Sequence, residues 1–132
     1  MRSSLISKLF LTILVLGNFS FAGEDATIYY VPIGMETYAP ITSETIRSQA
    51  REKWVITEPS RIRQLLAILR VGTPHSFDDA DVRAVIYCGG DIFFLNREGE
   101  VKSNSGSTLI KISDFSKFYS TLRKEEKRRV DQ

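Results

Sequence analysis

The stretch from Val82 to Ile112 constrains the fold most, because short apolar runs alternate in it with strong turn signals. Its first run has the two-residue period of a β-strand, with one face apolar. Gly89 and Gly90 follow directly, and this dipeptide is typical of a two-residue hairpin turn. The pattern predicts an antiparallel meander of about four strands. The predicted inward face of the first strand comprises Val82, Ala84, Ile86 and Cys88.

Other strand-like runs lie on both sides of that hairpin. Thr27–Ile33 and Lys53–Thr57 are rich in β-branched and aromatic residues, which favours strands there. Pro32 predicts that the first of them lies at a sheet edge or ends early, because proline cannot donate to a ladder. Within the meander the further strands are predicted at Asp91–Asn96, Glu100–Lys102 and Thr108–Ile112, with turns at Asn96–Gly99 and Ser103–Ser107.

Two segments carry apolar residues at helical spacing. In Glu58–Leu69 they recur every three or four positions, with Thr57 as the predicted N-cap. Gly72 is expected to end this helix in a left-handed conformation. Asp114–Leu122 carries a second continuous apolar stripe, with Ser113 as its predicted cap.

A short helix is also predicted, starting at Thr42 or Ser43 and running through Ala50, with Ile46 facing the core. A sheet with one apolar face and helices with one apolar stripe each have to bury that surface against another element. The predicted fold class is therefore α+β: an antiparallel sheet of about four to six strands with two main helices packed on one face. Aromatic residues are expected to supply much of the core: Trp54, Phe93, Phe94, Phe115 and Phe118.

The chain begins with the three-part pattern of a secretory signal peptide. Arg2 and Lys8 supply its positive end, and an apolar run follows over Leu9–Leu16. The run is shorter than the about 20 apolar residues that a spanning helix needs, which disfavours the alternative of a retained membrane anchor. We expect residues 1–22 to be cleaved after Ala22, leaving an exported bacterial protein, periplasmic or secreted, without a membrane span.

Residues 23–122 are predicted to form a single domain, and residues 123–132 a charged C-terminal tail. The whole chain has 18 Lys and Arg against 16 Asp and Glu. Arg2 and Lys8 leave with the predicted signal peptide, which contains no acid, so the remaining chain is formally neutral. Neutrality disfavours nucleic acid as a partner, because neutralising phosphates requires a basic face.

Cys88 is the single cysteine and His75 the single histidine of the chain. One cysteine cannot form an internal disulfide, and the strand position of Cys88 predicts a buried thiol. A Cys–His catalytic pair would require these two side chains to meet, which the predicted loop position of His75 disfavours. We predict no cofactor and no metal site, because a transition-metal site would need several His or Cys ligands.

The candidate binding residues lie in an acidic loop and two hairpin turns. An acidic loop can reach a basic cleft on another protein, and charge complementarity speeds such an encounter. The alternative is a solvated loop whose acids cap turns and keep the sheet edge from pairing with other strands. The candidate residues are Asp78, Asp79, Asp81, Gly89, Gly90, Asn96, Arg97 and Glu98.

A further stretch near the start of the predicted domain is rich in aromatic residues. It allows two interpretations. The first is a recognition surface, since tyrosines are enriched in interface hot spots, and the second is ordinary packing on the core. The residues concerned are Tyr29, Tyr30, Met35 and Tyr38.

Export, small size and few reactive side chains favour a protein that acts by contact. The predicted function is a non-enzymatic protein-binding module, an inhibitor or immunity-type protein whose partner is an enzyme or toxin in the bacterial periplasm. One alternative is an accessory subunit that adds a strand to an envelope complex through an exposed edge at Thr27–Ile33. The other is a small enzyme that uses loop carboxylates such as Asp78 and Asp81. The sequence leaves the oligomeric state open.

Overall fold

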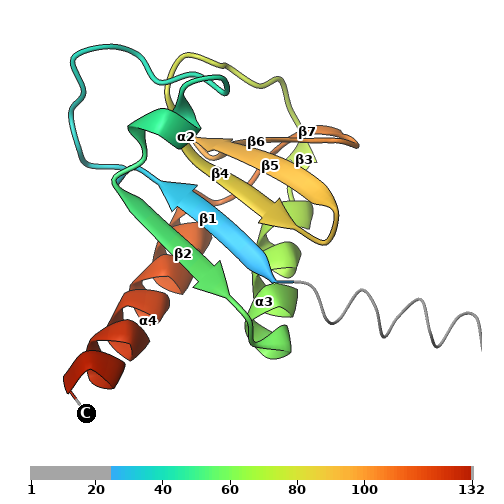
Figure 1. Cartoon of the computed structure of the whole chain (residues 1–132). Helices are drawn as coiled ribbons and strands as arrows, with labels where there is room; N and C mark the ends of the chain where they lie inside the picture. Colours follow the sequence, from blue (N-terminus) through green and yellow to red (C-terminus); the bar gives the residue numbers. More distant parts are fainter. Residues whose placement is uncertain (1–24, 132) are drawn as a thin grey trace, which may run out of the picture.

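The computed structural model describes residues 25–131, so the predicted signal peptide lies outside the described residues. Seven strands form one antiparallel sheet in the order β2-β1-β4-β5-β6-β7-β3. The strands are β1 (Ala26–Tyr30), β2 (Glu52–Ile56), β3 (Thr73–Pro74), β4 (Val82–Cys88), β5 (Asp91–Asn96), β6 (Glu100–Ser103) and β7 (Gly106–Leu109). The helices are α2 (Ile46–Gln49), α3 (Pro59–Arg70) and α4 (Ile112–Asp131). Figure 1 shows α3 and α4 behind the sheet and α2 in front of it.

The α+β class is confirmed, but the sheet has one strand more than the predicted range of about four to six. The additional strand is β3, which pairs Thr73 with Leu109 and Pro74 with Thr108 of β7. Two residues are too few to show a strand period, so the sequence gives no strand signal at these positions. Their pairing depends on β7, which lies beside them only in the folded chain.

The β4–β5 hairpin confirms the predicted two-residue turn. Gly89 and Gly90 have φ angles of 61° and 76°, a left-handed backbone that other residues rarely adopt. The predicted inward face of β4 is correct for three residues and wrong for Val82. The register shifts between Val82 and Ala84, so that Arg83 is an extra residue and Val82 points to the opposite face.

Of the two alternatives that Pro32 predicts for the strand near Thr27, the second is correct, because the strand ends early, at Tyr30, and does not lie at an edge. β1 lies inside the sheet, with β2 on one side and β4 on the other. The two edges of the sheet are instead β2 and the short β3, which contains Pro74. The chain reaches Pro32 only after β1 has ended, so the proline does not interrupt a ladder.

The main core lies between the sheet and the pair α3 and α4. Tyr30 contributes to it from β1, and burial raises the pKa of its phenol above the ordinary value. The indole Nε1 of Trp54 donates a hydrogen bond of 3.0 Å to the hydroxyl of Tyr119. The predicted apolar faces are confirmed, because the buried helix residues are Ile62, Leu65, Leu66 and Leu69 of α3 and Phe115, Phe118, Tyr119 and Leu122 of α4.

The predicted ends of α3 are wrong in detail. The N-cap residue is Glu58 and not the predicted Thr57, and its side chain forms no capping hydrogen bond. Pro59 occupies the first helical position, where its missing N–H costs little. Gly72 does not have a positive φ, so it is not a left-handed cap. A Cβ at this position would lie 2.6 Å from the carbonyl oxygen of Leu109. Glycine is therefore needed at position 72 for close approach to β7.

Helix α4 is longer at both ends than the predicted Asp114–Leu122. It begins at Ile112, so Ser113 lies inside the helix and is not its cap. It continues through Asp131, where a charged tail was predicted to follow the apolar stripe. Residues 123–131 consist mainly of Arg, Lys and Glu, which are good helix formers, with opposite charges at helical spacing. No helix in the described range 25–131 is long and apolar enough to cross a membrane.

A second, smaller cluster lies on the front of the sheet. Ile46 of α2 is buried there, which confirms that it faces a core, although not the core beneath α3 and α4. The predicted helix from Thr42 through Ala50 shortens to four residues, and the chain before it forms turns. Neither Thr42 nor Ser43 caps it, since the N-cap is Thr45. The buried residues of this cluster are Val31, Ile41, Ile46, Val82 and Val85.

Candidate protein-binding surface

A buried arginine holds together the end of the sheet at which the acidic loop lies. Arg83 is 1% exposed and forms an ion pair of 3.0 Å with Asp81. Its Nη1 also donates to the backbone carbonyls of Pro32 and Met35, at 3.2 and 2.8 Å. Arg97 approaches the other oxygen of Asp81 at 2.9 Å and donates to the same Met35 carbonyl. One carboxylate therefore serves two guanidinium groups that anchor the loop after β1.

A second polar cluster surrounds Glu100 at the same end of the sheet. Its Oε1 accepts hydrogen bonds from the backbone N–H of Asp78 (2.8 Å) and from the side chain of Asn96 (2.7 Å). These bonds stabilise the carboxylate and hold the pKa of Glu100 below the ordinary value. Its other oxygen lies 3.0 Å from Nδ1 of His75. The side-chain oxygen of Asn96 accepts from the N–H groups of Glu98 and Glu100 and so closes the β5–β6 turn.

Two of the three carboxylates of the acidic loop, those of Asp79 and Asp81, tie it to other parts of the molecule. Asp79 accepts from the N–H and hydroxyl of Ser43, at 2.7 and 2.9 Å, and so fixes the turn before α2. Asp78 accepts from the N–H of Ala80, a local turn contact. Asp81 is bound to two arginines. These contacts agree with the alternative in which the acids of the loop stabilise the fold. A binding role for these residues stays a prediction.

The predicted binding residues do not form one surface. Asn96, Arg97 and Glu98 lie beside the acidic loop, whereas Gly89 and Gly90 lie at the other end of β5. The six residues of β5 separate the two groups by roughly 17 Å. A hollow of about 410 Å³ lies at the glycine end; its lining consists of Asp25, Tyr87, Cys88, Gly89, Gly90, Asp91 and Ile92.

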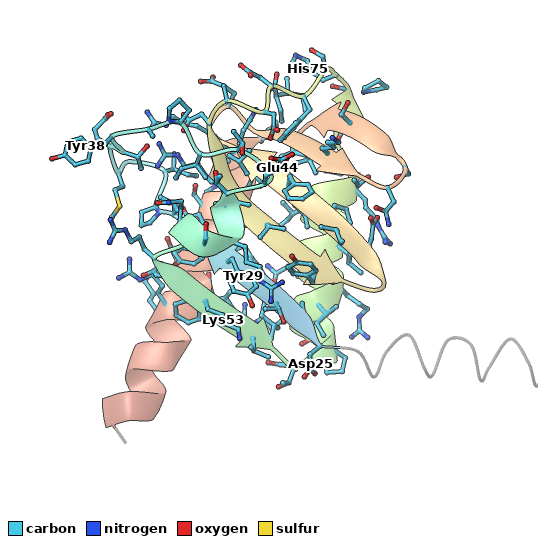
Figure 2. All side chains as sticks on the ribbon, turned by 45° about the horizontal axis from the view of Figure 1, so that its top comes forward. Asp25, Tyr29, Tyr38, Glu44, Lys53 and His75 are labelled. Carbon is cyan, nitrogen blue, oxygen red and sulfur yellow. The ribbon has the colours of Figure 1, made fainter. Side chains whose placement is uncertain are left out.

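The same separation applies to the two most reactive side chains. Cys88 is buried, as predicted, and lies at the hairpin end of β4. His75 contacts Glu100 at the opposite end of β5, and Figure 2 shows it at the top of the molecule, far from Asp25. A Cys–His pair is therefore absent from the described part of the chain. Nor does the range 25–131 contain a group of three His, Cys, Asp or Glu residues that could hold a metal ion.

The aromatic N-terminal stretch divides between the two interpretations left open for it. Tyr30 is buried in the main core, and Met35 packs against the second cluster. Tyr38 is fully exposed and stands at the tip of the loop after β1 (Figure 2). Tyr29 is half-buried on the front of the sheet, beside Lys53 of β2. Tyr29 also packs against the second cluster, so packing accounts for three of the four residues, while part of Tyr29 and all of Tyr38 remain accessible.

Tyr29 belongs to a part of the sheet that α2 leaves open. The strand register places Val55, Thr27, Tyr87 and Ile92 in one row across four strands, with Lys53 beside Tyr29 in the next. Val55 and Ile92 are 55% and 38% exposed, which is high for large apolar residues. We define the open face as Tyr29, Arg47, Lys53, Val55, Tyr87 and Ile92.

The open face combines tyrosines with positive charge. The rings of Tyr29 and Tyr87 meet edge to face, with centroids 6.1 Å apart. The guanidinium of Arg47 lies 5.3 and 5.9 Å from these two ring centroids. Nζ of Lys53 lies 5.5 Å from the ring of Tyr29. Each such cation–π contact stabilises by about 0.5–1 kcal/mol at an exposed site. The contacts hold Arg47 over both rings and Lys53 over the ring of Tyr29.

Sequence reasoning did not find this surface, although part of the signal was present. Strand alternation places Lys53 and Val55 on one face of β2, and Tyr29 was already a candidate. Arg47, however, reaches the tyrosines from α2, and the order of β2, β1 and β4 in the sheet is not visible in the sequence. Comparisons of the chain with protein-family models, with curated proteins and with solved structures found no match.

Proposed function

We propose that the protein is an exported, non-enzymatic binding module, an inhibitor or immunity-type protein that blocks another protein in the bacterial periplasm. The observation that carries the proposal is the open face, where two tyrosines and two cations lie beside two exposed aliphatic side chains. Tyrosine and arginine are the residue types enriched where proteins bind one another. The signal-peptide pattern of residues 1–22 supports export.

The layout of the fold also favours binding by the front of the sheet. Helices α3 and α4 cover the back, while α2 covers only the upper part of the front (Figure 1). Five of the six residues of the open face lie on strands of the sheet, so little backbone freedom has to be lost on binding. The accessory-subunit alternative loses the edge on which it depended, because β1 is paired on both sides.

The test is capture of a partner by the mature chain, residues 23–132, from bacterial envelope extract. Val55→Asp places a charge in the open face, on the edge strand β2, and Val71→Asp makes the same change at another exposed valine, next to the end of α3. We expect wild type and Val71→Asp to retain the same partner, and Val55→Asp to lose it by at least ~10-fold. Circular dichroism melting controls for folding of the two variants.

The inhibitory part of the proposal is tested on the captured partner. Its catalytic or toxic activity should fall as mature wild-type protein is added, and the Val55→Asp variant should leave that activity unchanged. Retention of the partner by Val55→Asp at wild-type strength, or capture of no partner at all, would contradict the proposal. Turnover of a substrate by the purified mature chain, lost on Asp78→Asn or Asp81→Asn, would favour the enzyme alternative.

A further inference from the structure

The cations of the open face differ in one respect from the two arginines beside the acidic loop. Arg83 and Arg97 both lie against Asp81, so their charges are balanced inside the protein. Arg47 and Lys53 have aromatic contacts, but neither forms an ion pair with any residue of the described part of the chain. Both cations lie within 6 Å of the same tyrosine ring, and therefore within about 11 Å of one another.

No acidic side chain among the described residues forms an ion pair with this pair of cations, although Glu44 lies three residues before Arg47 in the chain. Asp91, at the hairpin end of the open face, accepts hydrogen bonds from the N–H groups of Ile92 and Asn104. Asp25 is exposed at the lower end of β1. The face therefore carries two cations without an ion pair, although residues 23–132 are formally neutral.

We propose that the partner binds the open face through an acidic segment, whose carboxylates pair with Arg47 and Lys53 while apolar side chains contact Val55 and Ile92. The inference rests on the proposed binding function and adds the chemistry of the partner. A guanidinium stacked on rings keeps its N–H groups in plane and available, which suits two parallel hydrogen bonds to a carboxylate. Lys53 offers a second positive charge on the adjoining strand.

The charge of the open face is opposite to that of the acidic loop, which the sequence offers as the binding surface. The acidic loop predicted a partner with a basic cleft, but Asp81 already binds two arginines and Asp79 binds Ser43. Complementary potentials steer association and exclude partners of the wrong sign. Two unbalanced cations over an accessible aromatic pair therefore select an acidic partner.

The test uses a short peptide of alternating glutamate and tyrosine, titrated into isotope-labelled mature protein and followed by amide chemical shifts. The comparison peptide has glutamine in place of glutamate. We expect saturable shifts at Tyr29, Lys53 and Tyr87 with the glutamate peptide. The glutamine peptide should bind at least ~10-fold more weakly, and salt should weaken the glutamate peptide's binding.

Charge-reversal variants assign the effect to residues. Arg47→Glu and Lys53→Glu should each weaken glutamate-peptide binding by ~10-fold or more. Arg63→Glu makes the same charge change on the exposed side of α3, behind the sheet, and should change binding by less than ~2-fold. Arg47→Lys keeps the charge but loses the planar fork, and an intermediate loss is expected.

Three outcomes would overturn the inference. The first is equal binding of the two peptides, or shifts that map to the back of the molecule. The second is a dimer, found by sedimentation, that Arg47→Glu dissociates, since a second copy would then occupy the face. The third is binding to phosphatidylglycerol vesicles that depends on Arg47. If Val55→Asp abolishes capture of the envelope partner while Arg47→Glu and Lys53→Glu preserve it, the proposed function stands and the acidic partner does not.

Discussion

Replacing Asp81 by alanine tests whether the acidic loop is part of the scaffold. The substitution removes the carboxylate that lies 3.0 Å from Arg83 and 2.9 Å from Arg97. Removing one partner of a buried ion pair typically costs about 3–5 kcal/mol. Two features reduce this figure here. The side chain of Asp81 is 40% exposed, so solvent screens the pair, and Arg83 keeps the carbonyls of Pro32 and Met35 as acceptors. We expect a loss of about 2–3 kcal/mol.

Urea denaturation followed by circular dichroism measures this loss. At a slope of about 1–2 kcal/mol per M, the midpoint should fall by roughly 1–3 M. Asp79→Ala, which loses the hydrogen bonds to Ser43, should cost about 1 kcal/mol, and Asp78→Ala less than about 0.5 kcal/mol. Adding Arg83→Met to Asp81→Ala should restore part of the stability, because no charge is then left buried without its partner. Equal effects of the three single substitutions, or a loss below about 0.5 kcal/mol for Asp81→Ala, would refute the reasoning.

Further predictions concern the core and the turn after β5. Tyr119→Phe leaves the indole N–H of Trp54 without its acceptor and should cost about 1–2 kcal/mol in the same urea assay, with a changed tryptophan emission spectrum. The pKa of Glu100 is lowered by hydrogen bonds from Asp78 and Asn96, so its contribution to stability is complete above the ordinary value of 4.5 and is lost as the pH falls through the lowered pKa. Glu100→Gln should therefore destabilise at pH 7, and its difference from wild type should shrink below about pH 4.5 in pH-dependent melts. A difference that does not change with pH would show that the carboxylate charge is not involved.

Local patterns in the sequence predicted those parts of the fold that depend on local periodicity. The apolar spacing of α3 and α4 and the hairpin at Gly89 each follow from a short window of residues. The bulge at Arg83 does not, because it arises from the register of β4 against β5. Likewise β3 exists because β7 lies beside it. The position of Gly72 after α3 predicts a helix cap, whereas its role is set by contact with residues almost 40 positions later in the chain.

The candidate binding residues show that a sequence also does not reveal which charged groups bind one another in the fold. Asp79 and Ser43 are 36 residues apart, and the N–H of Asp78 reaches Glu100 over 22 residues. A sequence displays these groups as isolated charges or polar residues on loops, and only the folded chain shows that they bind one another. The acidic loop therefore looks more available in the sequence than it is in the structure.

The total charge is also a poor guide to the surface, since residues 23–132 are formally neutral. Neutrality of the whole is compatible with a charged surface when acids and bases are unequally engaged inside the fold. Asp81 balances Arg83 and Arg97 at one end of the sheet, while Arg47 and Lys53 are held above tyrosines without a carboxylate among the described residues. The field that a partner meets is set by the charges left unbalanced at the surface. On the open face those charges are positive, which is why the partner is expected to be acidic.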